Sequence, residues 1–88
     1  MFSKTVDVLN KRGLHARASA RFVTLAATLP VEVEVEKDGS KVCGTSIMGL
    51  MMLGAAMGDR ITISAIGDGA EHAVNALADL VEGKFGEE

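Results

Sequence analysis

The chain has 88 residues, 12 of them acidic and 9 basic, so its formal net charge is -3. This length supports one domain with a modest hydrophobic core, so we expect residues 1–88 to form a single domain. Without Trp, Tyr or a basic stripe, the chain lacks the phosphate-binding surface and stacking side chains that nucleic-acid binding requires.

The composition also argues against export and against a metal. The single cysteine, Cys43, excludes an internal disulfide, and its spacing to His15 and His72 matches no metal site. The N-terminal residues lack the apolar segment of a signal peptide, and the most apolar run, residues 47–57, is shorter than the roughly 20 residues of a membrane helix. We expect a cytoplasmic protein with no metal, no other cofactor and no membrane insertion.

The N-terminal third predicts a strand followed by a helix. Apolar and polar residues alternate over residues 5–9, which indicates a strand, and a polar turn ending in Gly13 follows. Apolar residues recur at helical spacing over residues 16–29, and Pro30 ends this helix.

His15 lies where the extended segment turns into the helix. A helix start leaves several backbone N–H groups unpaired and carries the positive end of the helix dipole, so it favours an anion. A neutral imidazole nitrogen there can take up a phosphoryl group beside Arg17. The alternative is that His15 only caps the helix and Arg17 is a solvated charge, and the local pattern alone favours this simpler interpretation.

The middle of the chain predicts a hairpin. Valine and glutamate alternate over residues 31–36, and the turn at Asp38 and Gly39 indicates a third strand, about residues 41–43, antiparallel to the second. We interpret the glutamate row as a solvated sheet face without a pocket rather than as a pair for acid–base catalysis. Cys43 is interpreted as a packed or edge cysteine rather than as a reactive thiol.

A short apolar helix is predicted over residues 47–53, with Ser46 as its N-cap and Gly54 after its end. Two turns cannot bury every apolar side chain in this run. The exposed side chains form either the edge of the core or a surface that accepts differently shaped partners.

A fourth strand and a last helix complete the chain. Alternation predicts the strand over residues 61–65, and an apolar stripe predicts the helix over residues 70–81. Asp68 and Glu71 resemble a capping box at the start of this helix, and His72 is expected on its solvated face. The order β-α-β-β-α-β-α predicts an α+β fold, a two-layer open-faced sandwich with helices on one face of a four-stranded antiparallel sheet.

The sequence resembles the HPr family, the histidine-containing phosphocarriers of the bacterial phosphoenolpyruvate-dependent phosphotransferase system. The resemblance covers nearly the whole chain. It is carried by residues 10–17 (NKRGLHAR), 38–39 (DG), 46–51 (SIMGLM) and 58–59 (GD). The family usually has a proline where this chain has Ala18, which keeps good helix propensity and adds one N–H donor.

The resemblance implies sheet order 1-4-2-3 and a phosphoryl carrier that is not itself an enzyme, because its partners supply the catalysis. His15 would accept the phosphoryl group from enzyme I as a pros-phosphohistidine and pass it to a histidine of an enzyme IIA domain. Arg17 and the backbone N–H groups of Ala16, Arg17 and Ala18 would stabilise the phosphate.

The resemblance further implies that Ser46 is a regulatory phosphorylation site for a dedicated HPr kinase/phosphorylase. The expected docking surface for partners is formed by Ala20, Ile47, Met48, Met51 and Met52, and the simplest oligomeric state is a monomer. Two alternatives stay open: a paralogue in a nitrogen-related regulatory phosphorelay, and a ferredoxin-like binding module in which His15 has no covalent chemistry.

Overall fold

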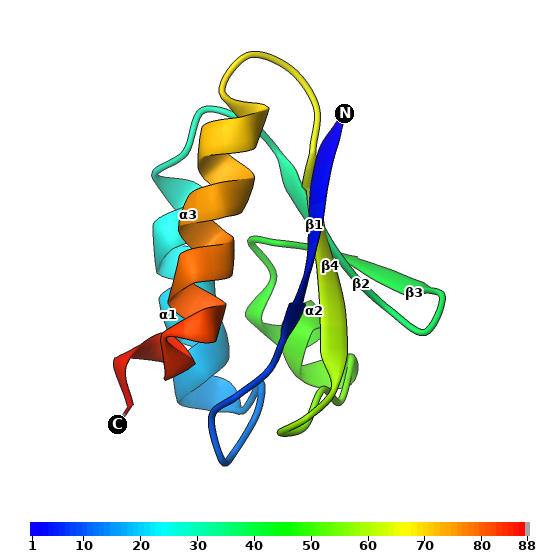
Figure 1. Ribbon diagram of the computed structural model, residues 1–88, viewed down its shortest axis with the longest axis vertical. Helices are drawn as coiled ribbons and strands as arrows, with labels where there is room; N and C mark the ends of the chain where they lie inside the picture. Colours follow the sequence, from blue (N-terminus) through cyan, green and yellow to red (C-terminus); the bar gives the residue numbers. More distant parts are fainter. Residues whose placement is uncertain (88) are drawn as a thin grey trace.

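The structure, a computed structural model, describes residues 1–87 as one sheet with helices on one side of it. In chain order its elements are β1 (Phe2–Asp7), α1 (Ala16–Ala27), β2 (Val33–Lys37), β3 (Ser40–Cys43), α2 (Ile47–Met52), β4 (Arg60–Ala65), α3 (Ala70–Glu82) and the 3-10 turn η1 (Lys84–Gly86). Figure 1 shows α1 and α3 side by side against the sheet. The predicted two-layer α+β fold is confirmed.

The four strands form one antiparallel sheet in the order β1-β4-β2-β3, as the resemblance implied. Val6 pairs with Ile61, and Val35 pairs with Ile63, so apolar residues of neighbouring strands share one face. This face and the helices enclose the core. Its largest fully buried hydrophobic side chains are Phe22, Phe85, Leu50, Ile61, Ile63, Leu77, Val8, Val35, Val74 and Val81.

The opposite face of the sheet is polar and open to solvent. Thr5 and Thr62 share a hydrogen bond between their hydroxyl groups (2.9 Å), and Lys41 lies 3.7 Å from a carboxylate oxygen of Glu34. This alternation of buried and exposed side chains is the reason that the helices cover only one face.

Four element boundaries differ from the sequence-based prediction by two or three residues. The first strand begins at Phe2 and ends at Asp7, and the second strand begins at Val33. The first helix ends at Ala27 because Thr28 closes it, donating both its N–H (3.0 Å) and its hydroxyl (2.7 Å) to the carbonyl oxygen of Leu25.

The predicted capping box at the last helix is wrong. The N-cap of α3 is Gly69, which has a left-handed backbone (φ 89°) and forms no side-chain cap. Its carbonyl accepts from the N–H of Ala73 (2.9 Å), so Asp68 lies one position before the cap and cannot pair reciprocally with Glu71. Within the described residues, no helix has both the length and the apolar character needed to cross a bilayer.

Candidate functional site

The loop between β1 and α1 is fixed against the loop between α2 and β4. Leu14 donates its N–H to the carbonyl of Ala55 (2.9 Å), and the Leu14 side chain is buried in the core. Gly13 has φ +63°, and a Cβ atom there would lie 2.2 Å from the carbonyl oxygen of Ala55. Only glycine therefore fits at this position without movement of the backbone, and this close approach defines where the next helix begins.

His15 is the N-cap of α1. Its backbone is extended (φ -79°, ψ -177°), and its carbonyl accepts from the N–H of Ser19 (2.9 Å). The ring atom Nδ1 faces the helix start and accepts a hydrogen bond from the N–H of Arg17 (3.3 Å). The side chain is 16% exposed, so a small part of the ring reaches solvent. His15 is therefore the helix cap that the sequence predicted, and the cap is formed by its ring atom Nδ1.

The second ring nitrogen of His15 meets a carboxylate from the end of the chain. Nε2 lies 2.6 Å from Oε2 of Glu87, whose other oxygen accepts from the amide of Asn10 (3.1 Å). The same Asn10 amide nitrogen donates to the carbonyl of Gly13 (2.8 Å), and the Asn10 side chain is fully buried. A carboxylate oxygen needs a donor and Nδ1 is already an acceptor, so the neutral imidazole carries its proton on Nε2, and Nδ1 is the unprotonated nitrogen.

The surroundings of Glu87 favour its charged form. Desolvation by itself raises the pKa of this carboxyl group. The hydrogen bonds from Asn10 and His15, together with the electrostatic influence of His15 and Arg21, outweigh desolvation, so the pKa of Glu87 is lowered from its usual value of 4.5. Glu87 is therefore an anion at neutral pH.

A sharp turn after α3 brings Glu87 to His15. Lys84, Phe85 and Gly86 all have left-handed backbones, with φ values of 60°, 56° and 75°. The side chain of Phe85 is fully buried, and Arg21 of α1 donates a hydrogen bond to the Phe85 carbonyl. Because left-handed geometry is unfavourable for a bulky residue, the buried ring and the arginine together hold a segment that would otherwise unwind.

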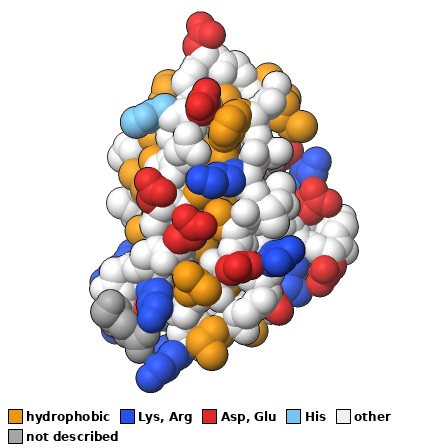
Figure 2. Space-filling model, in the orientation of Figure 1, with side chains coloured by type: hydrophobic (Ala, Val, Ile, Leu, Met, Phe, Trp, Pro, Cys, Tyr) orange, Lys and Arg blue, Asp and Glu red, His pale blue; other side chains and the backbone are white. Residues whose placement is uncertain are grey.

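Basic side chains surround His15. An open hollow of about 340 Å³ is lined by Lys11, Arg12, His15, Arg17, Arg21, Gly86 and Glu87. Figure 2 shows Lys and Arg side chains gathering at the lower left of the molecule, where Figure 1 places the end of α3. An acidic protein thus presents a locally basic surface, which attracts an anion.

The second predicted site lies at the start of α2. Ser46 is the N-cap, as predicted, and its Oγ accepts from the N–H of Gly49 (3.0 Å). Leu50 is buried, whereas Met48 and Met52 are 70% and 79% exposed. Ile47 and Met51 are exposed as well, and Ala20 of α1 is half-buried. Since α2 packs against α1, these apolar side chains extend over a surface continuous with the helix that His15 begins.

The other residues that the sequence singled out stand apart from His15. Cys43 is exposed and shares a hydrogen bond with the hydroxyl of Thr45 (3.1 Å), and His72 is exposed on α3. Among the described residues, no three His, Cys, Asp or Glu side chains are grouped closely enough to hold a metal ion.

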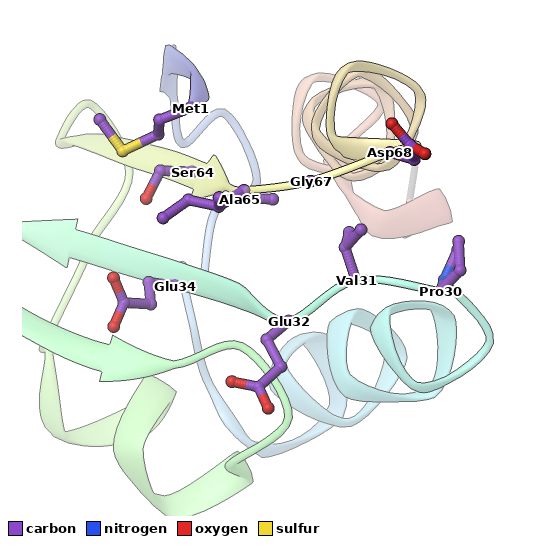
Figure 3. A pocket seen from close by; sticks show the side chains of 10 residues that line it. Met1, Pro30, Val31, Glu32, Glu34, Ser64, Ala65, Gly67 and Asp68 are labelled. Atoms are coloured by element: carbon purple, nitrogen blue, oxygen red, sulfur yellow. The ribbon is translucent and has the colours of Figure 1, made fainter.

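A larger hollow, about 620 Å³, lies at the opposite end of α1 (Figure 3). Glu32, Glu34 and Asp68 contribute to its lining. The sequence predicted that the glutamates would stand on a face without a pocket, so their presence beside this hollow is a difference from expectation. The hollow lies between the β4–α3 loop and the segment that leads into β2. The acidic lining repels a phosphate, so this hollow does not compete with the basic one.

Sequence reasoning missed Asn10, Arg21 and Glu87 as parts of the site. Asn10 lies in the predicted polar turn that ends in Gly13, and Arg21 lies within the predicted helix over residues 16–29, and neither pattern indicated a contact with His15. Glu87 is 72 positions from His15, so no local spacing connects them. The pairing of β1 with β4, and the packing of α3 over both strands, bring these distant segments together.

A small two-layer domain with an accessible histidine at a helix start, surrounded by basic side chains, is typical of a phosphoryl-carrier domain. The family model described as "PTS HPr component phosphorylation site" matches residues 2–83. A curated relative from Neisseria meningitidis, "Phosphocarrier protein HPr", is 47% identical over 87 residues, which are 99% of this chain and 98% of the relative.

Two further comparisons agree. The crystal structure of HPr-C-His from Thermoanaerobacter tengcongensis superposes with a TM-score of 0.94 at 49% identity and covers 100% of this chain and 99% of that one. A "Phosphocarrier protein NPr" from Shewanella violacea is 37% identical over 84 residues, 96% of this chain and 92% of the relative. The chain belongs to the HPr family and is a phosphocarrier of the phosphotransferase system.

Proposed function

We propose that His15 is the residue that carries the phosphoryl group and that Nδ1 is the atom that accepts it. The observation that supports this most directly is the orientation of the ring. Nδ1 lies against the N–H of Arg17 at the start of α1, while Nε2 is turned toward Glu87. The nucleophilic electron pair therefore points into the region where the helix dipole and free N–H groups stabilise an anion.

The transfer is a displacement at phosphorus. The electron pair on Nδ1 forms the new N–P bond while the bond between phosphorus and the donor nitrogen of enzyme I breaks. The backbone N–H groups of Ala16, Arg17 and Ala18 and the guanidinium group of Arg17 then stabilise the added negative charge. Passage to a histidine of an enzyme IIA domain repeats the displacement in the opposite sense.

The accepting site is open rather than enclosed, which fits a carrier that must meet several partners. The partner enzymes supply the remaining groups around the phosphorus, so the chain is a reactant in their catalysis and not an enzyme. We expect it to work as a monomer in the cytoplasm. Sedimentation at micromolar concentration tests the oligomeric state.

The exposed face of α2 serves as the docking surface for these partners, and Ser46 regulates it. The hydroxyl oxygen of Ser46 already accepts at a helix N-terminus, so a phosphate there is compatible with the helix. The negative charge of this phosphate, about -1.5 to -2 at pH 7, would lie beside Ile47 and Met48. It would oppose docking of an apolar or acidic surface there. A kinase that modifies Ser46 would therefore weaken coupling to enzyme I without unfolding the chain.

The decisive experiment incubates the protein with enzyme I and radiolabelled phosphoenolpyruvate and maps acid-labile phosphate. We expect label on His15, loss of label in His15→Ala, and full label in the matched control His72→Ala, which alters an exposed histidine on α3. Unlabelled wild-type protein, or label retained in His15→Ala, would refute the assignment. The first outcome would favour the binding module without covalent chemistry.

Sugar uptake is the branch that the relatives favour, since the relative named HPr is 47% identical and the one named NPr is 37% identical. Exchange rates with enzyme I and IIA domains of the sugar branch, compared with those of the nitrogen-related branch, test this choice. Faster exchange in the nitrogen-related branch would assign the chain to the regulatory phosphorelay.

A further inference from the structure

The carboxylate of Glu87 occupies a position that the carrier function alone does not explain. It accepts from Nε2 of His15 at 2.6 Å with one oxygen and from Asn10 at 3.1 Å with the other. The Glu87 and His15 side chains are only 14% and 16% exposed, so water screens this pair poorly. Glu87 thus contacts the nucleophilic ring on the side opposite to the reacting nitrogen.

We propose that Glu87 is a positioning residue for phosphoryl transfer. It fixes the Nε2–H tautomer of His15 and stabilises the positive charge that the ring gains when Nδ1 bonds to phosphorus. This inference rests on the proposed role of His15 as acceptor.

The charge balance explains the effect on both directions of transfer. When the Nδ1 electron pair forms the N–P bond, the ring, still carrying its proton on Nε2, becomes cationic. No proton moves to Glu87, whose charge stabilises this form. When the phosphoryl group departs, the electron pair of the N–P bond returns to Nδ1. Because Nε2 has kept its proton, the leaving group is a neutral imidazole rather than an imidazolate anion.

The geometry requires a carboxylate and not merely a polar side chain. Two donors, Nε2–H of His15 and the amide of Asn10, need two acceptor oxygens. Glutamine has one acceptor oxygen and would have to turn its NH₂ group toward one of these donors. Asn10 is fully buried and also holds the Gly13 carbonyl (2.8 Å), so it cannot turn away to relieve the conflict.

Among the described residues that line the hollow, the charged groups other than Glu87 are cationic. Lys11 and Arg12 of the preceding loop and Arg17 and Arg21 of α1 line the same hollow, in which Glu87 is the acidic residue. These cations attract the phosphoryl group but oppose a positive charge on the ring. Among the side chains that the structure describes at this hollow, Glu87 therefore supplies the interaction that favours the cationic ring.

The buried Phe85 ring and the Arg21 bond to the Phe85 carbonyl give this carboxylate a defined position, although it lies just beyond the last helical turn. A residue on an unsupported chain end would not keep a 2.6 Å contact at a partly buried ring. The three left-handed residues Lys84, Phe85 and Gly86 thus direct Glu87 to His15.

The test compares Glu87→Gln and Glu87→Ala with wild-type protein and with Glu82→Gln, a control that removes an exposed carboxylate near the end of α3. We expect the rate of phosphoryl acceptance from enzyme I to fall roughly tenfold in both Glu87 variants (about 1.4 kcal/mol), chiefly in kcat, and to be unchanged in Glu82→Gln. The matched change Glu87→Asp shortens the side chain and should restore the rate only in part.

Two readouts separate positioning from general structural support. Nitrogen-15 NMR of the unphosphorylated protein should show the Nε2–H tautomer of His15 in wild type and a mixture of tautomers in Glu87→Ala. In the phosphorylated protein, hydrolysis of the N–P bond should slow as rising pH removes the Nε2 proton. Because Glu87 stabilises the protonated ring, this decline in the hydrolysis rate should occur at lower pH in the Glu87 variants. A variant that only loosened the fold would not move this profile.

The outcomes distinguish the inference from the proposed function. Wild-type protein that takes up no label overturns the carrier role of His15 itself. Label on wild type, with Glu87→Gln accepting phosphate as fast as wild type or faster and keeping the same tautomer, overturns the role of Glu87 alone. Slower acceptance with a changed tautomer and a shifted profile supports it.

Discussion

Replacing Gly13 by alanine places a methyl group where the backbone of the α2–β4 loop already stands. The new Cβ atom would lie 2.2 Å from the carbonyl oxygen of Ala55 and 2.8 Å from the Cα atom of Ala56. Both are backbone atoms, so rotation of a side chain cannot relieve the overlap. Either the loop moves or the hydrogen bond from the Leu14 N–H to the Ala55 carbonyl (2.9 Å) is lost.

Gly54 offers a matched control for the magnitude. Its φ is +67°, close to the +63° of Gly13, but a Cβ atom there would meet nothing within 4 Å. Gly54→Ala should therefore cost only the left-handed backbone, about 1–2 kcal/mol. Gly13→Ala should cost that plus the overlap, for which over-packing suggests about 1–3 kcal/mol. The sum is about 2–5 kcal/mol, a large part of the stability of a small domain.

Urea and thermal unfolding measure both variants against wild type. Since about 1 kcal/mol shifts Tm by roughly 4–8 °C in a domain of this size, Gly13→Ala should melt at least about 4 °C below Gly54→Ala. His15 lies two positions beyond Gly13, so phosphoryl acceptance should also fall in Gly13→Ala but not in Gly54→Ala. Equal melting temperatures would refute the reasoning, because they would mean that the contact with Ala55 does not constrain the loop.

Three other predictions concern the cap of α2, its exposed face and the acid limb of stability. Ser46→Ala should lower the free energy of unfolding by about 1 kcal/mol through loss of the cap, whereas Ser46→Asp should keep the stability but slow phosphate exchange with enzyme I; an unchanged exchange rate would contradict the regulatory role. Met48→Ser and Met52→Ser should change stability by less than about 0.5 kcal/mol while raising the KM for enzyme I, and an unaltered KM would exclude this face from docking. The pKa of Glu87 is lowered in the folded state, so the stability that the Glu87 carboxylate contributes is present above pH 4.5 and is lost as the pH falls below that value. The acid limb of a pH–stability curve should therefore be shallower in Glu87→Gln than in wild type. Superimposable curves would count against this contribution.

The fold was largely predictable because its signals are local. The alternation of Val33 and Val35 with glutamates fixes a strand and its buried face, and Ser46 before an apolar run predicts a capped helix that the structure confirms. The one failed cap illustrates the limit of such patterns. Asp68 and Glu71 have capping-box residue types, but Gly69 between them takes a left-handed backbone and becomes the N-cap.

Of the site, only the segment with His15 and Arg17 was predictable from the sequence. His15 and Arg17 lie on one short segment, so their relation to the helix start can be deduced from sequence. The carboxylate at Nε2 cannot, because the contact between His15 and Glu87 depends on the pairing of β1 with β4 and on the turn after α3. Such a contact exists only after the tertiary fold is assembled.

The loop at Gly13 and the hairpin turn at Asp38 and Gly39 differ in their tolerance of insertions. The loop at Gly13 has no free volume, since the Ala55 backbone occupies the space beside it, whereas the hairpin turn at Asp38 and Gly39 is exposed and a side chain at Gly39 would meet nothing within 4 Å. Insertions are tolerated where backbone is neither buried nor hydrogen-bonded to a distant segment. The hairpin tip is therefore the place to attach a fluorescent label or an epitope. A fluorescence energy-transfer donor there would report partner docking without disturbing His15.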